Sequence, residues 1–206
     1  MPARDAIAVS ILYGLGLRPQ ELFGATFRQI SRERFRVAQV VTKTNGSSSS
    51  AKPVGRVIPA AKTAEGVRTM TMRAWLHEEL REWRAFLSEV GLPSGDDDFI
   101  IPRVAPDGHY TLEQQHNFIR DIKACGQVAA QHDPEVAYLT KVTPYSLRRG
   151  HISLRVLAGE DIKRIADECG TSTAMIHRYY LHELDMRHEM PEDFSFDGEY
   201  KLVDEH

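Results

Sequence analysis

The segment from Thr143 to His182 holds side chains that could carry chemistry within a short stretch of chain. Arg148 is a permanent cation, and Tyr179 and Tyr180 are adjacent phenols. A guanidinium donates a planar fork of hydrogen bonds to anionic oxygens. A phenol, whose pKa is about 10, becomes a nucleophile when its proton is removed or its anion is stabilised. An arginine placed beside a tyrosine could therefore form a reactive site.

The local pattern predicts three short helices that would place these side chains near one another. Thr143-Pro144 is typical of a helix start, and apolar residues at helical spacing continue the first helix to Ala158-Gly159. A second helix is predicted from Asp161 to Cys169 and a third from Thr173 to Tyr180, with the turn Gly170-Thr171-Ser172 between them.

Three motifs in this segment resemble those of the tyrosine recombinases, also called phage integrases. The family pattern H-x-L-R, L-G-H-S and Y-x-H corresponds here to Tyr145-Ser-Leu-Arg148, Cys169-Gly170-Thr171-Ser172 and Tyr180-Leu-His182. The resemblance implies that Tyr180 is the nucleophile and that His182 supports the site. Two positions depart from the pattern. Tyr145 stands where the family usually has histidine, and Thr171 stands where it usually has histidine or tryptophan.

Two upstream segments extend the resemblance. The string GLRPQEL resembles the family's G-L-R-x-x-E-L box, which implies that Arg18 is the first of two phosphate-clamping arginines and that Glu21 supports it. The string AKTAEGVRTMTM resembles the family's hairpin, which implies that Lys62 is a general acid and that Arg68 is its accompanying arginine. Lys43, in the similar string TKTNG, is the alternative, but we expect it to be a solvated loop lysine.

The resemblance implies cleavage and rejoining of DNA through a 3′-phosphotyrosyl intermediate. Arg18 and Arg148 would stabilise charge on the phosphate, and Tyr180 would attack it. Lys62 would then protonate the leaving 5′-oxygen. This chemistry conserves the phosphodiester bond energy, so we expect no cofactor and no metal.

The two replaced histidines and the second tyrosine leave alternatives open. Tyr145 and Thr171 can each still donate a hydrogen bond, and losing one such donor typically costs about 10²- to 10³-fold in rate. His151 or His177 could stand in for a missing imidazole. Tyr179 lies about 100° around the helix from Tyr180, so only one of the two should face the site.

Length, composition and charge are those of an ordinary globular protein. The chain has 206 residues, 42% hydrophobic and 27% charged. No apolar run approaches the roughly 20 residues of a membrane span, and we expect a cytoplasmic, nucleoid-associated protein. Cys125 and Cys169 show no metal-binding or disulfide spacing.

The charge distribution favours DNA more than the net charge does. The total is −3, but residues 183–206 carry nine acidic and two basic residues, so the rest of the chain is +4. A modestly basic body is compatible with double-stranded DNA as partner. The acidic tail contains Phe194 and Phe196, which could pack in a basic groove of a neighbouring copy and so support self-association on DNA. A tail that folds on its own domain or is disordered is the equal alternative.

The whole pattern predicts a mainly α-helical domain with a small antiparallel β-sheet, an α+β arrangement like that of the recombinase catalytic domain. Further helices are predicted from the apolar periodicity, and strands from short alternating or apolar runs. The expected helices are 3–17, a short one from Pro19, 73–90 and 111–131, and the expected strands are 35–41, 54–60 and 67–72. Segments 42–53 and 132–141 are expected to be loops, and 61–66 a tight hairpin turn.

We expect residues 1–182 to form the catalytic domain and residues 183–206 an acidic tail. The family's N-terminal core-binding domain is expected to be absent, because the first catalytic box lies close to Met1. The sequence favours a site-specific recombinase. A catalytically degenerate module that binds DNA or a partner is the main alternative, and a regulatory or structural helical protein without DNA contact is the second.

Overall fold

The computed structural model describes residues 3–44, 54–59, 67–104, 110–112, 115–186 and 188. It confirms the predicted class, because helices predominate and the strands are short and antiparallel. The helices are α1 (Ala3–Leu15), α2 (Pro19–Phe23), η1 (Phe27–Gln29), α3 (Ala74–Glu89), α4 (Gln115–His132), η2 (Pro134–Lys141), α5 (Pro144–Leu157), α6 (Ile162–Cys169), α7 (Thr173–Tyr179) and α8 (Leu181–Met186). The strands are β1 (Ile30–Ser31), β2 (Arg34–Val37), β3 (Gln39–Thr44), β4 (Val54–Pro59), β5 (Arg68–Thr71), β6 (Pro102–Val104) and β7 (Tyr110–Leu112).

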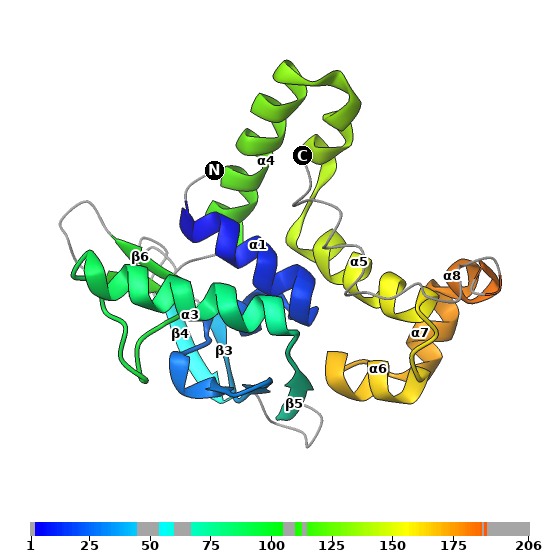
Figure 1. Cartoon of the computed structure of the whole chain (residues 1–206), viewed down its shortest axis with the longest axis horizontal. Helices are drawn as coiled ribbons and strands as arrows, with labels where there is room; N and C mark the ends of the chain where they lie inside the picture. The colour runs from blue at the N-terminus through cyan, green and yellow to red at the C-terminus, as the bar shows by residue number, and fades with distance from the viewer. Residues whose placement is uncertain are drawn as a thin grey trace.

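Helix α1 lies at the centre of the molecule. Its apolar residues Ile7, Ile11, Leu12 and Leu15 recur at helical spacing and are all buried. The helix contacts α2, α3, α4 and α5, and in Figure 1 it lies between α3 and α5. The first arginine of the predicted site follows directly after this central helix.

The strand pairing differs from the predicted arrangement. The expected strand 35–41 is divided between β2 and β3, which belong to different sheets. β5 pairs with β2, and β4 pairs with β3. The prediction that residues 54–60 and 67–72 pair with each other as a hairpin is therefore wrong. Alternation along the chain predicts strands but carries no information on which strands pair.

Two other expected elements also differ. Residues 134–141 form the 3₁₀ helix η2 instead of a loop, and it packs closely against α4. Residues 110–112 form β7, so the helix expected from 111 begins only at Gln115. Helix α8 crosses the boundary between the expected domain and tail, and it contacts α5 and α7. The turn at 61–66 lies outside the described residues.

Two hydrophobic clusters form the interior. The larger one is built from α1, α2, η1, β2, β5, α3 and α4, together with Ile100 and Ile101. The smaller one joins α5, α6 and α7 through Ile152, Val156, Ile165, Ile176 and neighbouring residues. Polar side chains from both sides meet between these clusters, and they include the predicted site arginines.

Candidate active site

Arg18 is held at the start of α2 by Glu21. Pro19 occupies the first helical position, where its missing N–H costs nothing. The backbone N–H of Arg18 donates to Glu21 Oε2 at 2.8 Å, and its guanidinium Nη1 donates to Oε1 at 3.0 Å. The i, i+3 spacing of the two residues therefore determines this part of the geometry.

Glu21 also binds a second arginine, Arg68 on β5. Arg68 donates from Nη1 to Glu21 Oε1 at 2.9 Å and from Nη2 to Oε2 at 2.8 Å. Both side chains are buried, with exposed fractions of 4% for Glu21 and 8% for Arg68. Burial alone would raise the pKa of Glu21, but the hydrogen bonds and charge of Arg68, with those of Arg18, hold its pKa below the ordinary value. Glu21 is therefore an anion between two cations.

Arg148 reaches the same place from α5. Thr143 caps this helix by accepting from the backbone N–H of Ser146, and Pro144 follows the cap. The buried guanidinium of Arg148 donates from Nη1 to the carbonyl of Gly16 at 2.5 Å. Burial lowers the pKa of Arg148.

The carboxyl end of α6 brings the three arginines together. The carbonyl of Glu168 accepts from Arg68 Nε at 2.6 Å, that of Cys169 accepts from Arg148 Nη2 at 2.7 Å, and that of Gly170 accepts from Arg18 Nη2. The last carbonyls of a helix lack intrahelical partners and carry the negative end of the helix dipole, so cations are favourable there. Three successive carbonyls thus each bind a different guanidinium.

Tyr180, the predicted nucleophile, and its neighbour Tyr179 border a hollow beside Arg148. The hollow has a volume of about 320 Å³ and is lined by Arg148, Arg149, Ile152, Thr171, Met175, Tyr179 and Tyr180. Tyr180 is 8% exposed and belongs to the smaller hydrophobic cluster. Tyr179 is 52% exposed and has the Arg178 guanidinium 5.5 Å from its ring centroid. The structure therefore brings Arg148, Thr171 and both tyrosines together.

Other predicted residues are not part of this hollow. Tyr145 is on the first turn of α5, 48% exposed, and does not line it. His182 is exposed on α8. Lys62 lies outside the described residues, and Lys43 is in strand β3 rather than in the loop that we expected.

The two histidines considered as substitutes differ in environment. His177 is exposed on α7. His151 is buried, and its Nδ1 lies 2.7 Å from the carbonyl of Tyr13, which requires a proton on Nδ1. Burial, with the charge of Arg155, lowers the pKa of His151 to about 3. His151 is therefore neutral and cannot supply the charge of an imidazolium.

The sequence resemblance identified Arg68 as the arginine that accompanies Lys62 in the hairpin, but not as one of the catalytic or supporting residues. The burial pattern of β5 alternates, with Arg68 and Met70 on the buried face. An arginine on the buried face of an otherwise alternating strand was the available signal, because a buried charge requires a partner.

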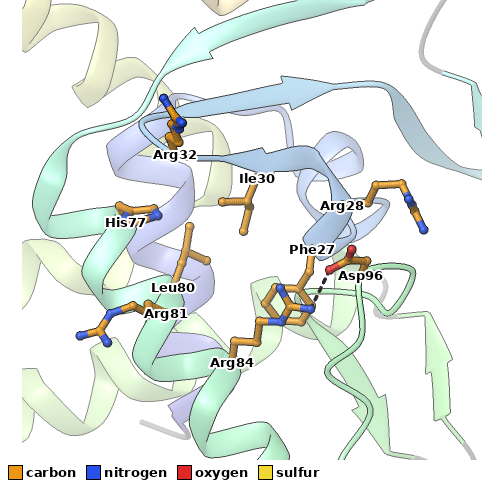
Figure 2. Close-up of a pocket in the computed structure, with 9 residues that line it drawn as sticks. All are labelled: Phe27, Arg28, Ile30, Arg32, His77, Leu80, Arg81, Arg84 and Asp96. Carbon is orange, nitrogen blue, oxygen red and sulfur yellow. Dashed lines mark hydrogen bonds and ion pairs between the residues drawn. The ribbon is translucent and has the colours of Figure 1, made fainter.

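Two other hollows are lined by no tyrosine. One, of about 290 Å³, is lined by residues of η1, β1 and α3 and the turns beside them, among them Arg28, Arg32, Arg81 and Arg84 (Figure 2). Three of these arginines form ion pairs: Arg28 with Asp97, Arg81 with Glu78, and Arg84 with Asp96. The other, of about 620 Å³, is an apolar groove between α1, α4, η2 and α5, and Cys125 is its one thiol among the described residues. The hollow beside Arg148 is therefore the best candidate for chemistry.

Comparisons with known proteins agree with this geometry. No protein family's sequence profile matches the chain. Tyrosine recombinase XerD of Pseudomonas aeruginosa is 29% identical over 179 residues, which cover 87% of this chain and 49% of that protein. A solved structure of the Tn1549 transposon integrase in complex with transposon right end DNA has a TM-score of 0.67 at 19% identity, covering 90% of this chain and 57% of that one.

This is the fold of the tyrosine recombinase catalytic domain. The XerA recombinase gives a further match, with a TM-score of 0.61 at 17% identity over 92% of this chain and 60% of that one. The predicted resemblance to tyrosine recombinases is thereby confirmed. The chain spans about half the length of the XerD recombinase that it matches, 49%.

None of the described helices is long and apolar enough to cross a membrane. In the same part of the chain, no group of three or more His, Cys, Asp or Glu side chains could hold a metal ion.

Proposed function

We propose that this chain is the catalytic part of a site-specific DNA recombinase that works through a 3′-phosphotyrosyl intermediate. The observation that carries the proposal is the convergence of Arg18 and Arg148 on the last turn of α6, beside a hollow that Tyr180 lines. Guanidiniums fixed in advance cost no reorganisation when negative charge develops on the phosphate. A phosphodiester is thus the substrate that suits this site.

The bonds that form and break lie within the protein and the DNA, and solvent water takes up the proton of the nucleophile. The Tyr180 hydroxyl gives its proton to solvent, and its oxygen forms a bond to phosphorus while the bond from phosphorus to the 5′-oxygen breaks. The leaving oxygen takes a proton, for which Lys62 is the proposed donor. Attack by a 5′-hydroxyl on the phosphotyrosine reverses the step and rejoins a strand. No cofactor enters the reaction.

The burial of Tyr180 favours one second candidate, a module that binds DNA without cutting it. A phenol with an exposed fraction of 8% must become accessible before it can attack. If it does not, the arginines could still bind a phosphate, and the protein would hold DNA at a site without forming a covalent bond.

The first experiment seeks the covalent adduct. Purified protein is incubated with nicked duplexes that carry candidate recombination sites from the DNA flanking its gene, and products are separated on a denaturing gel. We expect a protein–DNA adduct that is lost in Tyr180→Phe and retained in Tyr179→Phe, with the modified peptide located by mass spectrometry. DNA binding without an adduct in the wild-type protein would favour the non-cutting module. An adduct lost only in Tyr179→Phe would move the nucleophile by one residue.

We also propose that copies of the chain associate on DNA in the cytoplasm through the apolar groove. The groove is lined by ten residues: Val9, Ile122, Ala124, Cys125, Gly126, Val128, Ala129, Leu139, Val142 and Leu147. An open apolar groove of this size marks a docking surface. Residues 189–206 include Met190, Phe194, Phe196, Tyr200 and Leu202, which match its apolar lining, so the proposed occupant is the tail of a second copy.

A further inference from the structure

Arg68 binds groups that hold the proposed phosphate-binding arginines, namely the carboxylate of Glu21 and the end of α6. It lines none of the hollows described above, and it is buried. It donates to both oxygens of Glu21 and to the carbonyl of Glu168, so all three donating nitrogens of its guanidinium point to groups that hold other residues. Its contacts suggest action through its neighbours.

The first route runs through Glu21 to Arg18. Each Glu21 oxygen accepts from both arginines, Oε1 from two Nη1 groups at 3.0 and 2.9 Å, and Oε2 from the Arg18 backbone N–H and Arg68 Nη2, each at 2.8 Å. Arg68 therefore sets the plane of the carboxylate, and the carboxylate sets the position of Arg18.

The second route runs through the last turn of α6. Arg68 Nε donates to the carbonyl of Glu168. Glu168 directly precedes Cys169 and Gly170, whose carbonyls hold the two proposed phosphate-binding arginines, here called the clamp. These two carbonyls accept from Arg148 and Arg18 respectively. A shift of this turn would move both guanidiniums together.

Charge balance adds a third effect. Glu21 and Arg18 alone would form a nearly neutral pair, which would attract a phosphate weakly. Arg68 raises the formal charge of the group, because Arg18, Arg68, Arg148 and Glu21 together sum to +2, whereas the group without Arg68 sums to +1.

We propose that Arg68 is a positioning residue that aligns both phosphate-binding arginines, Arg18 through Glu21 and Arg148 through the carboxyl end of α6. The inference rests on the proposed recombinase function. It adds a residue that touches no substrate but determines where the clamp lies.

The test compares Arg68→Lys with the wild-type protein in single-turnover cleavage. Lysine keeps the charge but cannot bind two carboxylate oxygens and a carbonyl in one plane. We expect the cleavage rate to fall roughly 10- to 100-fold, the scale of a small misplacement in an active site, while DNA affinity changes little. Arg84→Lys is the control, because Arg84 likewise binds one backbone carbonyl, that of Ser94, and one carboxylate, that of Asp96, and neither group belongs to the site.

A modified substrate distinguishes misalignment of the Arg18 and Arg148 guanidiniums from a general loss of protein stability in Arg68→Lys. A methylphosphonate at the cleaved position removes one negative oxygen, so alignment of the guanidiniums matters less. We expect the defect of Arg68→Lys to shrink on this substrate. An equal defect on both substrates, or an equal loss in Arg84→Lys, would mean a merely structural role and overturn the inference.

An NMR measurement that needs no DNA cleavage tests the role of Arg68 separately from the proposed recombinase function. The guanidinium N–H signals of Arg18 and Arg148 can be followed by NMR in the wild-type protein and in Arg68→Lys. Loss or broadening of both sets in the variant is expected. Unchanged signals would contradict the inference even if the protein forms no adduct, whereas absence of an adduct in the wild-type protein bears on the proposed function alone.

Discussion

At the scale of single residues, His151 shows how burial changes the role of a side chain. Its ring lies where a Cβ on Gly16 would be, 2.4 Å from the ring carbon Cδ2, so only glycine fits at position 16. Gly16 also has a positive φ of 61° and supplies a carbonyl to Arg148. His151 therefore helps to pack the start of the site as a neutral group.

The protonation of His151 makes a prediction about stability. Its folded-state pKa of about 3 lies below the ordinary 6.5, because burial and then the charges of Arg155, Arg148 and Arg73 oppose the imidazolium. Below pH 6.5 the unfolded chain gains a proton that the folded protein excludes. The contribution is complete above pH 6.5 and is lost as pH falls toward 3, at up to about 1.4 kcal/mol per pH unit.

Urea unfolding between pH 6.5 and 5 measures this effect, since most carboxylates titrate at lower pH. We expect His151→Asn, which can still donate to the Tyr13 carbonyl, to show a shallower loss of unfolding free energy than the wild-type protein. Parallel pH profiles for the two proteins would show that His151 is not the residue that titrates.

At the scale of elements, the end of α6 combines a helix cap with the site. Gly170 ends the helix with φ of 63°, in the left-handed region that favours glycine. A Cβ on this residue would lie 2.9 Å from Cζ of Arg68. The same residue thus permits the cap, admits Arg68 and binds Arg18.

Gly170→Ala should therefore cost more than backbone strain alone. Gly91 is the matched control, because its φ is 73° and a Cβ there would meet nothing within 4 Å. We expect Gly91→Ala to lose about 1–2 kcal/mol of unfolding free energy, from the left-handed backbone only. Gly170→Ala should lose more and should also lose the proposed cleavage activity, as measured by thermal unfolding and adduct formation. Equal losses in the two variants would contradict the role of close packing against Arg68.

At the scale of the whole molecule, the site lies where the two hydrophobic clusters meet. Arg18 and Arg68 come from elements of the larger cluster, and they reach α6 of the smaller one, which lies beside β5 in Figure 1. Arg73 on the side of the larger cluster also pairs with Glu160 at 2.7 Å. The clamp therefore depends on how the two clusters dock.

The apolar groove leads to a prediction about association. Val128 lines the groove on α4 and is exposed, and a carboxylate there would be poorly solvated under a docked apolar tail. We expect Val128→Glu to reduce the mass of the DNA complex measured by light scattering, as should deletion of residues 189–206. Gln127→Glu, an exposed neighbour that does not line the groove, is the control. A deletion that lowers thermal stability but leaves the mass unchanged would place the tail on its own domain.

The sequence alone was enough for features that depend on neighbouring residues. The caps at Thr143 and Ser172, the apolar faces of α1, α3 and α5, and the i, i+3 contact of Arg18 with Glu21 all follow from local spacing. The resemblance in short motifs also assigned Arg148, Thr171 and Tyr180 to a single site. In the structure all three side chains line one hollow.

Only the tertiary structure decided which distant groups meet. The contact of Arg18 with Gly170 spans 152 positions in the chain, and that of Arg68 with Glu21 spans 47. Strand pairing, the exposure of Tyr145 and the neutrality of His151 are likewise outcomes of how the helices pack. Periodicity reports which face of an element is buried, but it does not report what that face is buried against.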